Sequence, residues 1–340
     1  MRIFFLTQYY FDLHVPIVDE LKRQGHEVYV VKDKAFPFDC RLVSNTGVQR
    51  YVSIFLEKIY DQRKYYWTKE ISNNPNLQEK YDLLLCINGV SFHPRLLLHL
   101  KKINPKIRSL LYLWDTQQYY NYLHYERYFD KIVTFDWNDS VKYERLELLP
   151  AYWQPSHPKP IKYDLSIIGS DHDGRFEIIS KIYCQLEEAG CSSFMKVVKH
   201  EPREPRGWRK YIIRYKKQYE AKMVDFNRKK GSPLISSETF SINNILDIID
   251  QSNCVLDTDR PSQSGATQRV VWSLARGKKI ISTNTSLKNM PFYRKDQFRF
   301  IDRDNPKVDI EFIKEKKEFP ISDEILALRI DRWVNRLIDD

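Results

Sequence analysis

The sequence predicts an α/β protein built from two Rossmann-like domains. A chain of 340 residues is too long for one ordinary hydrophobic core, and its hydrophobic content of 42% is enough for two. In both halves, short apolar runs alternate with amphipathic helical runs, which is the order of parallel βαβ units. A proline-dense stretch lies between the halves. We therefore predict a first domain over 1–150, a linker over 151–160 and a second domain over 161–340.

The first domain opens with an apolar strand, MRIFFLTQYY, followed by an amphipathic helix, a turn at Gly25 and a second strand. Asp12 and His14 lie between that strand and helix. This is the carboxyl end of the strand, where open α/β sheets hold their ligands. His14 is therefore a candidate general base, and a helix-capping or core histidine is the alternative interpretation.

Further strands are predicted over 81–89, 108–115 and 131–139, and a helical stretch over 49–70 has no assigned role. Polar residues end these strands, and parallel strands bring their carboxyl ends to one edge of the sheet. Each such residue alone is also explained as a strand terminator or helix cap. Together they predict a site at this edge: Asn88, Asp115, Asp136 and Asp139.

The second domain begins with a strand over 165–168, a turn at Gly169-Ser170 and a helix starting near Arg175. A strand, a glycine turn and a helix in this order form an anion site, and Arg175 would supply its fixed charge. A helix over 237–253 follows later in the chain, and a helix over 323–338 closes it.

A complete βαβ unit occupies 253–284. An apolar strand ends at Asp257, a polar loop follows, a helix runs from about Thr267 to the Gly277 stop, and a second strand starts at Lys279. We expect the loop to offer unpaired backbone N–H groups, small hydroxyls and the positive end of a helix dipole to a phosphate. Its contributing residues are Ser262, Ser264, Gly265, Thr267 and Arg269.

The net charge of +10 is concentrated in one segment. Residues 196–230 hold thirteen Lys and Arg against four Asp and Glu. This charge indicates an anionic partner, which is a membrane surface, a nucleic acid or a saccharide. Aromatic residues recur there near helical spacing, which is typical of a helix lying on an anionic membrane. A surface helix that packs its aromatics on its own domain is the alternative.

Several site classes are not expected. The five cysteines are scattered without a Cys-x-x-Cys pair, so we expect neither zinc nor disulfides. No Walker phosphate-binding loop is present, and the Gly-x-Gly-x-x-Gly fingerprint is also missing, which argues against nicotinamide dinucleotides. The Asp-x-Asp triplets at 171–173 and 257–259 arise readily by chance among 45 acids, so no metal is expected. No apolar run is long enough to span a bilayer and no signal peptide is recognisable, so we expect a cytoplasmic protein.

The segment SQSGATQRVVWSLARGKKIISTN resembles the donor-site segment of bacterial two-domain glycosyltransferases of the GT-B type, those encoded with lipopolysaccharide and capsule genes. The family pattern is Gln-x-Gly-x-Thr-x-Arg, an apolar helix, Gly-Lys-Lys, an apolar strand and Thr-Asn. The upstream stretches YDLSIIGSDHDGR and YLWD are also similar to such proteins. The matching residues are Gln263, Gly265, Thr267, Arg269, Gly277, Lys278, Lys279, Thr283 and Asn284.

The resemblance implies two Rossmann-like domains facing across a cleft. It implies transfer of a sugar from a nucleotide-activated donor to a glycan or lipid-linked acceptor, in bacterial surface polysaccharide synthesis at the inner face of the cytoplasmic membrane. It implies no cofactor, no metal and no nucleic acid. If the reaction inverts the anomeric centre, His14, Asp12 or Asp115 would take the acceptor proton. The donor-binding residues would be Gly169, Ser170, Arg175, Gln263, Ser264, Gly265, Thr267, Arg269 and Lys278.

One residue departs from the family pattern. Trp272 stands where these enzymes carry a glutamate that bonds the donor ribose, which leaves the donor nucleotide open. Trp272 would either stack on a base or fill the core, and we expect the core. The alternative function is a non-catalytic binding protein that uses its basic patch for nucleic acid or another anionic partner.

Overall fold

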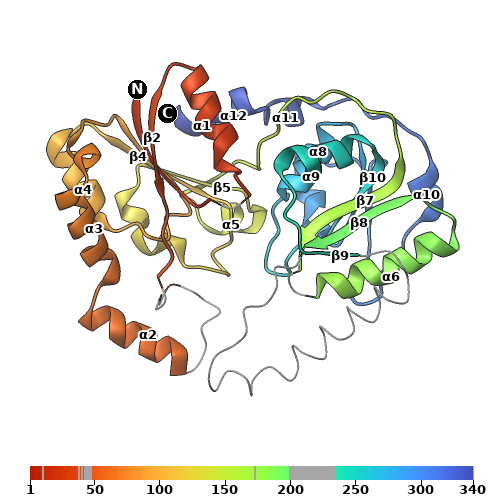
Figure 1. Ribbon diagram of the computed structural model, residues 1–340, viewed down its shortest axis with the longest axis horizontal. Helices are drawn as coiled ribbons and strands as arrows, with labels where there is room; N and C mark the ends of the chain where they lie inside the picture. The colour runs from red at the N-terminus through yellow and green to blue at the C-terminus, as the bar shows by residue number, and fades with distance from the viewer. Residues whose placement is uncertain are drawn as a thin grey trace. The chain divides into compact units, whose positions relative to one another are not determined.

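The structure is a computed structural model that describes residues 1–9, 11–36, 39, 41, 48–171, 174–198 and 234–339. The chain forms two compact units (Figure 1). The first unit consists of Met1–Gln154, Ser262–Ala266 and Ala327–Asp340, and the second of Pro155–Pro261 and Thr267–Leu326. The chain first passes from one unit to the other within the predicted linker. Two short segments of the predicted second domain belong to the first unit.

The first unit contains a parallel six-stranded sheet in the order β2-β1-β3-β4-β5-β6. Helices and 3-10 turns connect its strands, as in a Rossmann-like fold. The strands are β1 (Arg2–Thr7), β2 (Glu27–Lys32), β3 (Leu83–Ile87), β4 (Arg108–Leu113), β5 (Lys131–Thr134) and β6 (Leu146–Leu148). The helical elements are α1 (His14–Arg23), α2 (Val48–Ile59), α3 (Gln62–Asn73), η1 (Pro75–Gln78), α4 (Pro94–Ile103), η2 (Tyr122–Tyr128), α5 (Trp137–Lys142) and α12 (Ile330–Ile338).

Side-chain caps explain where several of these helices begin. The predicted single helix over 49–70 is two helices, because the Asp61 carboxylate accepts the Lys64 N–H and starts α3 anew. His93 caps α4 in the same manner, and Pro94 takes the first helical position. Asp136 caps α5, so the predicted strand over 131–139 ends early, at Thr134.

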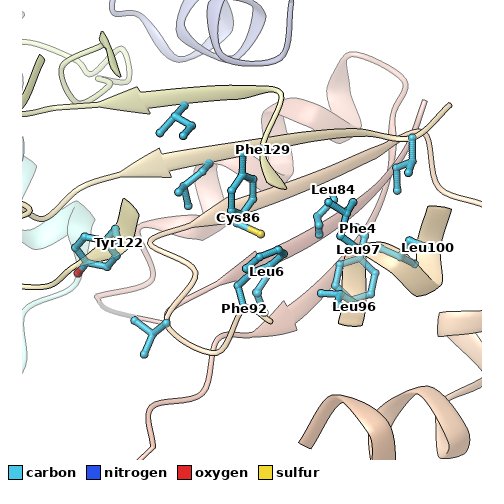
Figure 2. Close-up of a cluster of buried hydrophobic side chains, with 14 of the residues drawn as sticks. Phe4, Leu6, Leu84, Cys86, Phe92, Leu96, Leu97, Leu100, Tyr122 and Phe129 are labelled. Atoms are coloured by element: carbon cyan, nitrogen blue, oxygen red, sulfur yellow. The ribbon is translucent and has the colours of Figure 1, made fainter. Parts of the chain in front are cut away.

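The core on one face of the first sheet is shown in Figure 2. Phe4 and Leu6 of β1 and Leu84 and Cys86 of β3 lie two residues apart, so each pair points to the same face. They are fully buried. Leucines of α4 cover them: Leu96, Leu97 and Leu100. The strands thereby have buried apolar side chains on this face of the sheet.

The end of the chain returns to the first unit. The predicted helix over 323–338 is two helices, α11 (Asp323–Leu326) and α12, because Arg329 is extended and pairs with Trp153. Trp333 of α12 is fully buried, and its indole N–H donates to the Pro150 carbonyl at 2.8 Å. Helix α12 is therefore part of the first unit's core.

The second unit contains a parallel six-stranded sheet in the order β12-β11-β10-β7-β8-β9. The strands are β7 (Tyr163–Ser170), β8 (Ser193–Val198), β9 (Ile235–Ser236), β10 (Ser252–Asp257), β11 (Lys279–Ser282) and β12 (Phe298–Phe300). The helical elements are α6 (Arg175–Glu188), α8 (Ile242–Asp250), α9 (Gln268–Leu274), η4 (Thr285–Asn289), α10 (Ile310–Lys314) and α11. The predicted α/β class with two Rossmann-like domains is confirmed.

Helix α8 shows how the sequence sets a boundary. We expected a helix over 237–253, and the structure starts it at Ile242 because Ser241 and Asn244 form a reciprocal capping box. Its early end leaves Ser252 to begin β10, which is buried along its whole length. This strand delivers Asp257 to the carboxyl edge of the second sheet.

Candidate functional site

Asn88 organises the carboxyl edge of the first sheet. It follows β3 in the left-handed backbone region, with φ of 59°, which asparagine tolerates better than most residues. Its amide nitrogen donates to Gln8 at 3.2 Å and to Asp115 at 3.0 Å, and its amide oxygen accepts the Trp114 N–H. The ends of β1, β3 and β4 are thus joined by one buried side chain.

Asp115 receives further donors at this edge. The Tyr122 hydroxyl donates to its carboxylate at 3.2 Å, and the Gln263 amide donates at 3.4 Å. Burial raises the pKa of Tyr122 well above its usual value, so the phenol keeps its proton. Gln263 and Asp115, both predicted site residues, therefore meet within the first unit.

His14 and Asp12 lie at the start of α1. The His14 ring is buried and stacks on Tyr9 with centroids 4.2 Å apart, and its Nδ1 has no hydrogen-bond partner among the described residues. Burial lowers the pKa of His14, although Asp12 acts to raise it, so the imidazole favours its neutral, basic form. Asp12 itself is exposed and left-handed, with φ of 54°.

Asp136 holds the loop that was expected to bind phosphate. Its carboxylate accepts the Ser264 N–H at 2.6 Å, the Ser264 hydroxyl at 2.7 Å and the Gly265 N–H at 2.9 Å. The Ser264 hydroxyl in turn accepts the Asn138 N–H at 2.8 Å. The expectation of unpaired N–H groups is therefore wrong at Ser264 and Gly265, because a carboxylate of the first unit already occupies them.

Two neighbours of Asp136 complete this arrangement. A Cβ at Gly265 would lie 2.6 Å from both the ring and the carbonyl oxygen of Phe135, so only glycine fits here. Asp139 accepts the Gln117 N–H at 2.8 Å. The pKa of Asp139 is raised to about 6, mainly by burial; the Gln117 N–H acts to lower it and the nearby Asp136 charge acts to raise it.

The carboxyl edge of the second sheet is cationic. The Arg175 guanidinium donates to the carbonyl oxygens of Ser170 at 2.5 Å and Thr258 at 2.8 Å, and its Nε has no partner among the described residues. Burial lowers the pKa of Arg175 to about 10, with the positive charge of Arg269 as the next cause. A Cβ at Gly169 would lie 2.9 Å from Arg175 Nη1 and 3.0 Å from Arg269 Nη2. Two guanidinium groups thus converge on Gly169.

Arg269 is held by a buried carboxylate. Its Nη1 pairs with Asp257 at 2.7 Å, and its Nη2 donates to the Ile168 carbonyl at 3.0 Å. Asp257 is fully buried and also accepts the hydroxyls of Thr267 at 2.8 Å and Ser282 at 3.3 Å. Thr267 thus begins α9 as its cap and shares Asp257 with Arg269.

A third arginine was missed by the sequence analysis. Arg303 donates to the Asp259 carbonyl at 2.7 Å and lies 3.7 Å from the Asp259 carboxylate. The Thr283 hydroxyl donates to the same carboxylate. Arg303 lies in a region without clear periodicity, so no local pattern connects it with β10.

Two predicted positions lie elsewhere. Lys278 precedes β11 at the amino edge of the sheet, where its ammonium donates to the Asp250 carbonyl at 2.8 Å. The structure does not bring Lys278 together with Arg175 and Arg269. Trp272 is only 5% exposed on α9, so the expectation that it fills the core is confirmed.

The structure describes only part of the residues that the metal and membrane predictions concern. Within the described ranges, no cluster of three or more His, Cys, Asp and Glu side chains is arranged to hold a metal ion, and of 171–173 only Asp171 is described. No helix in the described part of the chain is long and apolar enough to cross a membrane. Most of the basic segment 196–230 lies outside the described residues, which resume at Leu234.

No protein-family model matches the chain, and no curated protein sequence matches it. Solved structures do match. The UDP-forming α,α-trehalose-phosphate synthase from Burkholderia vietnamiensis has a TM-score of 0.58 at 10% identity, covering 100% of this chain and 96% of that chain. Sucrose-phosphate synthase from Thermosynechococcus elongatus gives 0.54 at 12%, covering 99% and 94%. HepE from Anabaena, in complex with UDP and glucose, gives 0.51 at 10%, covering 100% and 96%.

These structural neighbours are GT-B glycosyltransferases, and the chain shares their fold of two Rossmann-like domains. At identities of 10–12%, this structural similarity shows the fold alone.

Proposed function

We propose that the chain is a glycosyltransferase that moves a sugar from a nucleotide-activated donor to a glycan or lipid-linked acceptor. The donor diphosphate would lie at the carboxyl edge of the second sheet, next to Gly169. Ser170, Thr267 and Arg269 would line the same place.

The observation that carries this proposal is the state of Arg175. It is 9% exposed, and its guanidinium contacts only carbonyl oxygens among the described residues. A buried charge is costly, and the positive charge of Arg269 adds to the cost. The Asp257 charge, which Arg269 already pairs with, offsets this cost only in part. A diphosphate would supply further negative charge to the two guanidinium groups and accept fork-like hydrogen bonds. It would also stabilise the charge that develops on the leaving group.

The acceptor would bind over the first sheet. In an inverting reaction, His14, Asp12 or Asp115 would take the acceptor hydroxyl proton, and the neutral form favoured for His14 suits that role. A retaining reaction would not need this base. We further propose that the product is a bacterial surface polysaccharide, made by a protein peripheral to the inner face of the cytoplasmic membrane. No metal would be required, because the arginines supply the positive charge.

A nucleotide panel tests the proposal. Thermal unfolding of the full chain is measured with UDP, GDP, CMP, dTDP and their sugar conjugates. UDP is tried first, because the synthase from Burkholderia vietnamiensis is UDP-forming and HepE was solved with UDP. A ligand at 100 times its Kd should stabilise the protein by about 2.7 kcal/mol.

The Arg175→Met variant is the matched test of the site. It should lose the nucleotide-dependent shift while remaining folded, and Arg175→Lys should recover little of it because an ammonium lacks the guanidinium fork. The proposal fails if no nucleotide or nucleotide sugar shifts the unfolding of the wild type. Binding of an oligonucleotide with a steep salt dependence would instead favour the non-catalytic alternative.

A further inference from the structure

Helix α2 carries its apolar residues on an exposed face. Tyr51, Phe55 and Ile59 follow one another at four-residue intervals and are 76%, 63% and 68% exposed. Val52 beside them is 42% exposed. Side chains four residues apart lie on the same side of a helix, so these residues form one stripe, which we call the α2 face. An amphipathic helix of a globular protein normally buries such a stripe.

The α2 face continues onto the start of α3. Tyr60, which is 51% exposed, lies 5.6 Å from the ring of Tyr65, which is 58% exposed. Asp61 caps α3 and also pairs with His93, the cap of α4, at 3.2 Å. The end of α2 and the starts of α3 and α4 therefore meet, and in Figure 1 α2 extends away from the α3–α4 pair.

The surface around this junction is positively charged. Exposed lysines on α2 and α3 flank the aromatic rings. Arg95, Leu98 and Lys102 lie on one side of α4 and line a groove of about 590 Å³ with Ile71 of α3, and no acidic residue lines that groove. Glu57 is already held by Arg63 at 2.5 Å. The exposed cations are Lys58, Lys64, Lys69, Arg95 and Lys102.

We propose that the α2 face, with the flanking cations of α3 and α4, docks the first unit on an anionic phospholipid bilayer. Tyrosine and phenylalanine rings bury their apolar part at the headgroup boundary, and lysine and arginine attract lipid phosphates. A second copy of the chain fits less well, because it would bring the same excess of cations to the interface. The α2 face and its flanking cations include none of residues 196–230, and the proposal holds whether or not the chain transfers a sugar.

Vesicle cosedimentation of the full chain tests the proposal. The wild type should bind vesicles that contain phosphatidylglycerol and bind pure phosphatidylcholine vesicles much more weakly. The triple variant Tyr51→Ser, Phe55→Ser, Ile59→Ser should bind at least about 10-fold more weakly, because binding follows the apolar area that is inserted. The variant Lys58→Gln, Lys64→Gln, Lys102→Gln should also bind more weakly and with a smaller dependence on salt.

Val141→Ser is the matched control, since Val141 is an exposed apolar side chain on α5, at 69% exposure. It should bind as the wild type does. Circular dichroism and the unfolding temperature establish that each variant is folded. Wild-type vesicle binding by the triple variant would overturn the proposal. So would an α2-dependent dimer, seen by sedimentation velocity, without any loss of vesicle binding.

Discussion

The carboxyl edges of the two sheets both belong to parallel six-stranded sheets, and they differ in charge. The first edge gathers carboxylates, each of which accepts N–H or O–H groups: Asp115, Asp136 and Asp139. The second edge gathers guanidinium groups, which are held by carbonyl oxygens and by Asp257 and Asp259: Arg175, Arg269 and Arg303. Because both sheets are parallel and six-stranded, the few residues that follow each strand set the chemistry. The acidic edge suits hydroxyl groups and protons, and the cationic edge suits phosphates.

Within the cationic edge, the two converging arginines differ in the charges that would remain if each were removed. Arg269 neutralises the fully buried Asp257, whereas Arg175 contacts no carboxylate among the described residues. Removing Arg269 would leave the buried Asp257 carboxylate without its ion-pair partner. Removing Arg175 would remove a buried positive charge that Asp257 offsets only in part.

The largest expected effect on stability is therefore that of Arg269→Met. We expect it to lower the free energy of unfolding by about 3–5 kcal/mol, the usual cost of breaking a buried ion pair on one side. Arg175→Met should leave the unliganded protein as stable as the wild type or more so. Urea denaturation of both variants without nucleotide measures this. Equal losses of unfolding free energy in the two variants would show that the ion pair with Asp257 does not make Arg269 more important for stability than Arg175.

A pair of glycine substitutions compares the two edges directly. An added Cβ at Gly265 meets the Phe135 backbone, whereas one at Gly169 meets only the ends of two arginine side chains. We expect Gly265→Ala to destabilise the protein by about 1–3 kcal/mol, because the backbone cannot move aside cheaply. Gly169→Ala should cost less stability and weaken nucleotide binding, because it displaces the guanidinium groups.

The unfolding free energy and the nucleotide Kd of each variant check this. The contrast between rigid backbone and movable side chains is refuted if Gly169→Ala loses as much stability as Gly265→Ala and binds nucleotide normally.

The sequence indicated much of this arrangement, because strand ends and helix starts follow local rules. Apolar runs placed Asp115 and Asp136 at one edge, and the turn before α6 placed Arg175 at the other. Long-range pairings were not predictable. Nothing near Ser264 in the sequence indicates that Asp136 takes its N–H group, and nothing near Arg329 indicates that the chain returns to Trp153. Lys278 matched a family pattern, yet its strand places it at the opposite edge.

The smallest expected effect is on how the free energy of unfolding depends on pH, and it differs between the two units. The folded-state pKa of Asp139 is raised from 3.8 to about 6, so its protonated form is favoured on folding. Its contribution to stability is therefore fully present below pH 3.8 and is lost as the pH rises through about 6. Relative to Asp139→Asn, the wild type should lose on the order of 1 kcal/mol across this range.

Asp309, the cap of α10 in the second unit, provides the control of opposite sign. The Phe312 N–H is the main cause that lowers the pKa of Asp309, with Arg299 contributing. Its contribution is present above pH 3.8 and is lost as the pH falls. Urea denaturation at several pH values should thus give opposite slopes for Asp139→Asn and Asp309→Asn, each measured against the wild type. Parallel slopes would mean that burial does not govern Asp139, and that the acidic edge is as open to water as an ordinary helix cap.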